Sequence, residues 1–178
     1  MLGTIGYYIH DNKLLEAPNT TPDSLVLQKL MAKLVHTGAK SVVMGASSHG
    51  LALGRCDVID FNVAVFTNFT RDDFDFHVTT DEYRKSKGKL FDKMSDPENH
   101  RKVVNVDDFN AYYFLSLGNP DVPIVTFGME SRSADVLPLV DTPKGKTEIS
   151  SKLIGRFNVY HILAAVAVGV AVDAPVEA

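Results

Sequence analysis

Two short runs of mostly apolar residues constrain the fold of this chain more than any other feature. Residues 41–46 and 62–68 are nearly continuous apolar segments, and each is followed by polar or charged residues such as Ser47 and Arg71. A strand buried on both faces loses the alternation of a half-exposed strand, so we expect both runs inside a parallel sheet that helices cover. Ligands of such sheets bind beyond the carboxyl ends of the strands. The sequence therefore predicts an α/β fold with a site at that edge.

The remaining segments predict alternating helices and strands. An apolar face at helical period predicts a helix from the Thr20–Thr21 start to His36, which Gly38 ends. The other expected elements are a strand at 2–9, a polar helix at 80–94, a strand at 102–106, a helix at 108–117, a strand at 122–127, short strands at 135–140 and 146–151, and a final helix opening near Asn158. Of these, the segments between 102 and 127 form a βαβ unit, and the two short strands form an antiparallel hairpin. The predicted fold class is α/β, a mostly parallel sheet flanked by helices with a small antiparallel hairpin portion.

Composition narrows the function classes. The 178 residues suffice for one domain with a core, and a net charge of −4 argues against direct nucleic-acid binding, which needs a concentrated basic surface. The single cysteine, Cys56, is expected to be a small buried residue in a reducing compartment. The apolar run at 159–172 is too short to cross a bilayer, and residues 1–24 lack the features of a secretory or organelle leader. We therefore expect no membrane partner, no nucleic-acid partner and no targeting segment in this chain.

Several segments, in order along the chain, resemble the central domain of the Mur ligase family. They are LGTIGYY at 2–8, APNTTPD at 17–23, ASSHGLALGR at 46–55, VFTN at 65–68, TRD at 70–72 and GRFN at 155–158. The resemblance is to the MurE type, which adds the third amino acid to a UDP-N-acetylmuramoyl dipeptide. The segments EAPNTTPD and RKVVNVDD are similar to the plant plastid branch. The resemblance implies the family's three-layer, P-loop-like architecture.

Family members join a carboxylate to an amine by phosphorylating the carboxylate with ATP and letting the amine displace phosphate from the acyl-phosphate. Mg²⁺ screens the phosphoryl oxygens in such chemistry. The family's phosphate-binding loop precedes the LGTIGYY segment, and no G-x-x-x-x-G-K-[ST] pattern occurs in this chain. We therefore expect residues 1–178 to be a partial, truncated and divergent central domain. The P-loop, the amino-terminal uridine-binding domain and the carboxy-terminal ligase domain are expected to be absent.

The resemblance also assigns the metal-side residues. Gly45 stands where the family has a glutamate that binds magnesium, and so marks a lost ligand, while Asp73 replaces a metal-contacting histidine. Lys87 falls at the position of the family's carbamoylated lysine and is the catalytic candidate. Without the resemblance, a helical lysine beside Lys85 and Lys89 is interpreted as solvated surface.

On the substrate side, the resemblance implies that Thr20, Thr21, Ser47 and Arg55 contact the UDP-muramoyl dipeptide. The guanidinium fork of Arg55 suits a carboxylate, which it can bind through two hydrogen bonds. Structural interpretations stay open for the others. The two threonines precede Pro-Asp and could simply cap a helix, and Ser47 could simply close off a strand.

The nucleotide-side positions are Asn68 and Asn158, which match family positions near the nucleotide. A second expected asparagine is replaced by His161. The cofactors that the resemblance implies are ATP and Mg²⁺, and the implied substrates are the UDP-muramoyl dipeptide and an amino acid.

Two hypotheses about function follow. By resemblance the chain is a MurE-type, ATP-dependent acid–amino acid ligase. Three expected losses, of the phosphate loop, of the glutamate at Gly45 and of the closing carboxy-terminal domain, together predict that this chain is itself catalytically incompetent. Losing one metal ligand or electrostatic stabiliser alone typically costs roughly 100-fold or more in rate. The alternative is a non-catalytic structural or interaction module of a plastid protein complex, or a truncated gene product. The resemblance implies the chloroplast stroma, otherwise the cytoplasm, and a protein partner that covers exposed domain faces.

Overall fold

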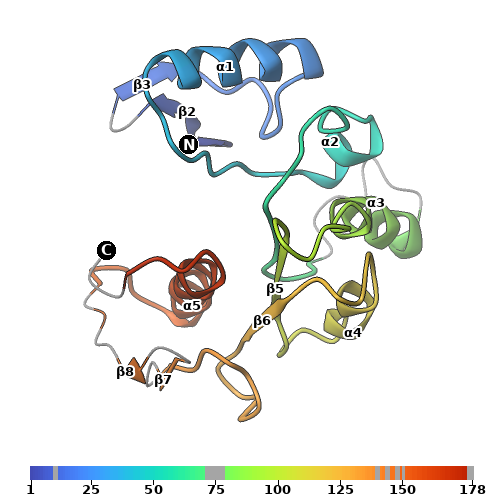
Figure 1. The fold of residues 1–178 in the computed structure, drawn as a ribbon, viewed down its shortest axis with the longest axis vertical. Coiled ribbons are helices and arrows are strands. Elements are labelled where there is room, and N and C mark those ends of the chain that lie inside the picture. Colours follow the sequence, from blue (N-terminus) through green and yellow to red (C-terminus); the bar gives the residue numbers. More distant parts are fainter. Residues whose placement is uncertain are drawn as a thin grey trace. The chain divides into compact units, whose positions relative to one another are not determined.

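The structure is a computed structural model that describes residues 1–9, 12–70, 79–138, 141–142, 145–146, 149 and 151–175. The chain divides into two compact units, which are described separately below (Figure 1). Unit 1 comprises Met1–Asp60 with Arg71–Lys89, and unit 2 comprises Phe61–Thr70 with Leu90–Ala178. In the described part of the chain, no helix has the length and apolar character needed to span a membrane.

Unit 1 is built on an antiparallel sheet of three strands in the order β1-β2-β3. Its elements are β1 (Leu2–Gly3), β2 (Gly6–Ile9), β3 (Asn12–Leu15), α1 (Ser24–His36), α2 (Ser48–Ala52) and most of α3 (Thr80–Asp92). Leu27 and Leu30 of α1 pack with Leu2 and Tyr7 of the sheet in one buried cluster. Gly38 follows α1 with a φ of 79°, a left-handed conformation that ends the helix as predicted. The expected single strand at 2–9 is two strands joined by a turn.

The expectation of a sheet strand at residues 41–46 is wrong. Within this run only Met44 forms a β-bridge, an isolated parallel one with Leu2. Two backbone hydrogen bonds of 2.9 Å hold it there, from Leu2 N to the Val43 carbonyl and from Gly45 N to the Leu2 carbonyl. Val43 is 71% exposed, so the segment is not buried on both faces. Apolar composition alone does not distinguish such an extended segment from a buried strand.

Unit 2 contains a parallel sheet of three strands in the order β4-β5-β6, which confirms the predicted fold class. The strands are β4 (Val63–Phe66), β5 (Arg101–Asn105) and β6 (Ile124–Phe127). In the register, Val65 pairs with Val103, which in turn pairs with Val125. Residues 102–105 of the central strand β5 are all buried. At the centre of the strand this burial on both faces allows two successive apolar residues, Val103 and Val104, while Lys102 and Asn105 are buried polar residues.

Helices cover both faces of this sheet, with α4 (Ala111–Leu115) and α5 (Arg156–Ala171) on opposite sides (Figure 1). On the α5 side, Val103 packs with Leu163 and Ala167 in a buried cluster. On the α4 side, Phe66 stacks on Phe114 with ring centroids 3.9 Å apart. The result is the three-layer arrangement that the family resemblance implies.

Lys102 is a buried charge on the α4 side of β5. Its Nζ donates to the carbonyls of Leu117 at 2.6 Å and Asn119 at 3.0 Å. Burial lowers the pKa of Lys102, because a low-dielectric interior disfavours the charged form. The lysine thereby supplies donors to the turn that follows α4.

An antiparallel hairpin is present as predicted, but its described strands lie mostly at other residues than expected. Its strands are β7 (Asp141–Thr142) and β8 (Gly145–Lys146), which pair antiparallel. The strand expected at 135–140 is not present at 135–138, where only Val136 forms an isolated parallel bridge with Phe127. Helix α5 begins at Arg156, two residues before the predicted start, and Cys56 is fully buried as predicted.

Candidate functional site

In unit 1, Thr21 joins the segment before α1 to the start of α2. Thr21 is fully buried, and its Oγ1 donates to the Gly45 carbonyl at 2.9 Å and accepts from Ser47 N at 2.8 Å. The same Oγ1 lies 3.1 Å from Ser47 Oγ, which accepts from Gly50 N at 3.0 Å. Two substrate-side candidates, Thr21 and Ser47, are therefore in direct contact. We call Thr20, Thr21, Ser47 and Arg55 the hydroxyl–guanidinium cluster.

The two threonines do not cap α1, so the capping interpretation is wrong. The N-cap residue of α1 is Asp23. Thr20 Oγ1 instead lies 2.8 Å from Thr4 Oγ1. Ser47 does not close off a strand, since residues 41–46 form none, but its side chain caps the start of α2. A substrate role for these residues stays a prediction.

Arg55 is held by two partners from the segment around the start of α1. Its Nε lies 3.0 Å from Asp23 Oδ1, and its Nη1 donates to the Thr21 carbonyl at 3.0 Å. The Arg55 side chain is 16% exposed, whereas that of Asp23 is 66% exposed. Nearby, the hydroxyl of buried Tyr7 donates to the Asn19 carbonyl at 2.7 Å, and burial is the main cause that raises the pKa of Tyr7. The Thr21 carbonyl and the Asp23 carboxylate thus fix the orientation of the Arg55 guanidinium.

Gly45 has no room for a side chain as the cluster stands. A Cβ built on Gly45 would lie 2.9 Å from Thr20 Cγ2, closer than carbon atoms approach in folded proteins. Asp73, the other metal-side candidate, lies outside the described residues. In the ranges that the structure describes, no group of three or more His, Cys, Asp or Glu side chains could hold a metal ion.

Lys87 is a half-buried residue of α3, not a fully solvated one. Its Nζ lies 5.0 Å from the centroid of the Tyr83 ring, within the range of a cation–π contact. The neighbouring lysines have other contacts. Lys85 pairs with Asp81 at 2.9 Å, and Lys89 Nζ lies 3.4 Å and 3.3 Å from two carbonyls at the end of α2. The catalytic role of Lys87 stays a prediction.

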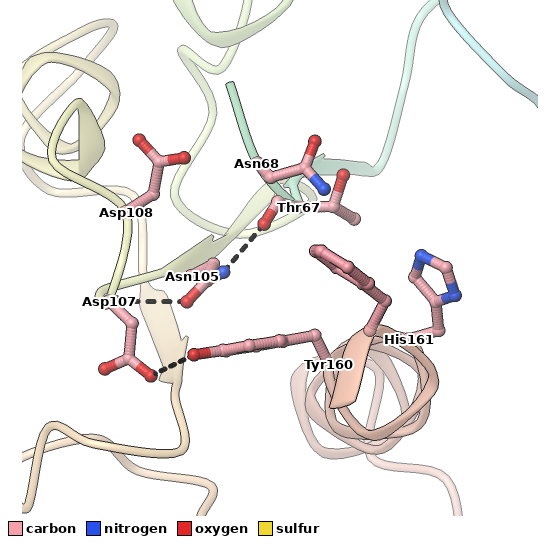
Figure 2. A pocket seen from close by; sticks show the side chains of 8 residues that line it. Thr67, Asn68, Asn105, Asp107, Asp108, Tyr160 and His161 are labelled. Carbon is pink, nitrogen blue, oxygen red and sulfur yellow. Dashed lines mark hydrogen bonds between the residues drawn. The ribbon is translucent and has the colours of Figure 1, made fainter. Parts of the chain in front are cut away.

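In unit 2, a pocket of about 180 Å³ opens beyond the carboxyl ends of β4 and β5, beside the first turns of α5 (Figure 2). This is the sheet edge at which the sequence predicts a site. The residues that line the pocket are Thr67, Asn68, Asn105, Asp107, Asp108, Phe157, Tyr160 and His161.

Asp107 organises one wall of this pocket. Its carboxylate accepts from the backbone N–H groups of Met129 at 2.6 Å, Glu130 at 2.9 Å and Ser131 at 2.9 Å. It also accepts from the Tyr160 hydroxyl at 2.8 Å (Figure 2). Burial acts to raise the pKa of Asp107, but these four donors outweigh it and hold the pKa below its usual value. Burial and the bond to Asp107 raise the pKa of Tyr160. The carboxylate therefore ties α5 to the loop after β6.

The other polar side chains of the wall also have internal partners. Asp108 accepts from Phe69 N at 2.8 Å. Asn105 donates to the Thr67 carbonyl at 2.8 Å (Figure 2). The two carboxylates give the pocket a negative wall, which does not suit phosphate groups. A small uncharged group with hydrogen-bonding edges suits it better.

Sequence reasoning found only part of this pocket. Asn68 and His161 line it, but Asn158 does not, since its side-chain amide donates to the Ile154 carbonyl at 2.8 Å. Asp107 and Asp108 were missed as pocket residues, although they follow β5 as Asn68 follows β4 and the same strand-end rule would have found them. The nucleotide-side roles of the two asparagines stay predictions.

Comparison with known proteins places the whole chain in one group. The family described as the Mur ligase middle domain matches residues 1–169. The chain is 54% identical to the UDP-N-acetylmuramoyl-L-alanyl-D-glutamate–2,6-diaminopimelate ligase MurE homolog, chloroplastic, of Arabidopsis thaliana, over 99% of this chain and 25% of that protein. It is 38% identical to the corresponding ligase of Bacillus licheniformis, over 98% of this chain and 38% of that protein.

A solved structure of a UDP-N-acetylmuramoyl-L-alanyl-D-glutamate–2,6-diaminopimelate ligase is also similar, with a TM-score of 0.84 and 28% identity over 98% of this chain and 37% of that one. The chain thus spans between a quarter and two fifths of the length of these relatives. The Arabidopsis alignment runs over 191 positions, more than the 178 residues of this chain, so that relative contains additional residues within the matched region.

Proposed function

Since the chain belongs to the Mur ligase family and matches its middle domain, we propose that it binds the UDP-muramoyl peptide class of substrate without completing amide ligation. The proposal takes the substrate class from the printed names of the plant and bacterial relatives. The chloroplastic description of the Arabidopsis relative supports a plastid location for this chain.

The observation that carries the substrate proposal is the hydroxyl–guanidinium cluster. Thr21 and Ser47 are bonded to each other, and Arg55 is bonded to the Thr21 carbonyl, so three candidates that are up to 34 residues apart form one connected group. A hydroxyl can donate to a peptide carbonyl or a phosphate, and a guanidinium recognises a carboxylate. A UDP-muramoyl dipeptide carries all of these groups.

Among the residues that the structure describes, the metal half of the family's chemistry does not fit. Gly45 offers no side-chain oxygen, and the Thr20 methyl group occupies the space of a side chain there. Lys87 lies over the Tyr83 ring, where an ammonium is favourable. A carbamate at Lys87 would place negative charge toward the ring's negative face. We therefore derive no step through Mg²⁺.

If ATP binds at the unit 2 pocket, the pocket suits the uncharged base of the nucleotide and not its phosphates. Its negative wall at Asp107 and Asp108 disfavours phosphate, and Asn68 supplies an amide that could contact a base. We place this role on Asn68 and leave Asn158, bonded to Ile154, outside the pocket.

The test measures binding and turnover separately on the 178-residue chain. Calorimetry with UDP-N-acetylmuramoyl-L-alanyl-D-glutamate should detect binding, which Arg55→Met should weaken about tenfold or more, because a hydrogen bond to a charged group is worth roughly 1.5–3 kcal/mol. Glu16→Gln is the matched control, since it removes a charge from the exposed Lys13–Glu16 pair of the same unit. Phosphate release with ATP, Mg²⁺ and 2,6-diaminopimelate should not exceed that of buffer. Absent binding, or clear turnover, contradicts the proposal.

A second candidate is a non-catalytic interaction module. The observation that favours it is a set of large apolar side chains left in solvent on unit 2, including Phe109 at 99%, Ile154 at 91% and Tyr112 at 83% exposure. Exposed apolar patches mark partner surfaces or aggregation. Binding of an apolar dye, and concentration-dependent association in sedimentation, are the expected results, and a monomer that binds no dye would contradict this candidate.

A further inference from the structure

Asp23 does not behave as an aspartate at the start of a helix usually does. An N-cap aspartate normally accepts a hydrogen bond from the second or third backbone N–H of its helix. Asp23 is the N-cap of α1 and makes no such side-chain bond. Its carboxylate lies instead 3.0 Å from Arg55 Nε. Helix α1 therefore lacks a side-chain cap, because the carboxylate that could supply it is paired with Arg55.

The two partners of this ion pair differ in how firmly they are held. Arg55 is 16% exposed and is also bonded to the Thr21 carbonyl at 3.0 Å, so the guanidinium is fixed in place. The Asp23 side chain is 66% exposed. An ion pair with one well-exposed member is weak, because solvent competes for that member. Asp23 is therefore the partner that can leave.

We propose that Asp23 is a displaceable internal counter-ion of Arg55. In the free protein its carboxylate occupies the guanidinium. When the carboxylate of a ligand takes that place, Asp23 turns back to the N–H of Leu25 or Val26 and caps α1. The proposal rests on the proposed function, in which Arg55 binds a carboxylate of the UDP-muramoyl peptide.

In this exchange both charged groups always have a partner. Arg55 pairs first with Asp23 and then with the ligand carboxylate, while Asp23 moves from Arg55 to the N-terminus of α1. Two carboxylates on one guanidinium would repel each other, so ligand binding drives Asp23 away. The vacant cap of α1 offers the displaced carboxylate a hydrogen bond and the positive end of the helix dipole. A neutral ligand group cannot start this exchange, because it does not compete for the charge of Arg55. Asp23 thereby favours anionic ligands over neutral ones. It also lowers the apparent affinity for the ligand, because the ligand can bind only while Arg55 is not paired with Asp23.

A first experiment needs no ligand. NMR measures how fast the Leu25 and Val26 amides exchange with water in the wild-type chain and in Arg55→Met. In this variant Asp23 has lost its ion-pair partner and should cap α1. Both amides should then exchange about fivefold more slowly than in the wild type. Asp23→Asn keeps an N-cap side chain but removes the ion pair, and should slow both amides without altering Arg55. Glu16→Gln should change neither rate. Unchanged rates in both variants, or the same slowing in Asp23→Ala/Arg55→Met, would overturn the proposal.

A second experiment measures affinity for UDP-N-acetylmuramoyl-L-alanyl-D-glutamate by calorimetry. Asp23→Asn should bind about three- to tenfold more tightly than the wild type, and Asp23→Asn/Arg55→Met should show no such gain over Arg55→Met. If amide exchange responds as expected but no variant binds the ligand, the proposed function fails and the counter-ion role stands. If the ligand binds but Asp23→Asn changes neither affinity nor amide exchange, the counter-ion role fails and the proposed function stands.

Discussion

Replacing Gly50 by alanine tests how tightly the hydroxyl–guanidinium cluster is packed. Gly50 is a buried residue of α2, and a Cβ there would lie 2.7 Å from Thr21 Cβ, 2.8 Å from its Cγ2 and 2.9 Å from its Oγ1. In an unconstrained helix interior, alanine is more stable than glycine by about 1 kcal/mol. At this position we expect the opposite sign, because the new methyl group meets an atom bonded directly to the backbone.

The expected magnitude follows from what Thr21 would lose. Thr21 Cβ cannot rotate away, so the residue must shift as a whole, and such overpacking typically costs about 1–3 kcal/mol. A shift also lengthens the bonds of Thr21 to the Gly45 carbonyl and to Ser47 N, each worth roughly 0.5–1.5 kcal/mol. After the helix gain is subtracted, we expect Gly50→Ala to lower the free energy of unfolding by about 2–4 kcal/mol.

A matched control lies in α5, where Gly169→Ala makes the same substitution in another helix. A Cβ at Gly169 would meet only Ala174 Cβ at 3.8 Å, an ordinary contact. Here we expect stabilisation of about 0.5–1 kcal/mol. Urea unfolding followed by circular dichroism measures both variants, and hydrogen exchange in α1 and α2 assigns the Gly50 effect to unit 1. A stabilising or neutral Gly50→Ala, or a clearly destabilising Gly169→Ala, would refute the packing argument.

Three further predictions follow from single contacts. Gly45→Ala should force the Thr20 methyl group to move, so that the hydroxyl contact of Thr20 with Thr4 is lost. We expect the free energy of unfolding to fall by about 1 kcal/mol, which thermal unfolding measures. Lys102→Ala should leave two carbonyls without a donor and a cavity in the sheet, lowering the unfolding free energy by about 2–4 kcal/mol in urea titrations. The lowered pKa of Asp107 means that its charged form stabilises the fold fully above the unfolded pKa of about 3.9, and that this stability is lost as pH falls through the lower folded pKa. Asp107→Asn should therefore be less stable at pH 7 and lose less stability between about pH 4 and pH 2 in unfolding measured across that range.

The elements of unit 2 were predictable because their signals are local. The strands β4 and β6 are short, mostly apolar runs, and β5 has Val103 and Val104 at its centre. Helix α5 is a long apolar segment, so composition and length identify these elements. Residues 41–46 have the same composition and were assigned wrongly. Which partner an extended apolar segment takes depends on contacts distant in sequence, here the bridge from Met44 to Leu2, and no local pattern encodes that choice.

The sequence predicts those site residues that follow the ends of strands. It does not predict those whose position depends on contacts between residues far apart in the sequence. Asn68 follows β4 and lines the pocket, as the strand-end rule predicts. The partnership of Asp23 with Arg55 joins positions 32 residues apart, and the Thr-Pro-Asp order suggests only a helix start. A residue that suits one local role can take another when a partly buried charge from a distant segment lies within reach, as Arg55 does for Asp23.

Two glycines make room for the two threonines of the hydroxyl–guanidinium cluster in unit 1. The methyl group of Thr20 occupies the space in front of Gly45, and Thr21 lies against the backbone of Gly50. The two threonines are therefore seated in the volumes that two missing side chains leave. Gly45→Glu should therefore destabilise unit 1 in urea titrations, because the new Cβ would meet the Thr20 methyl group.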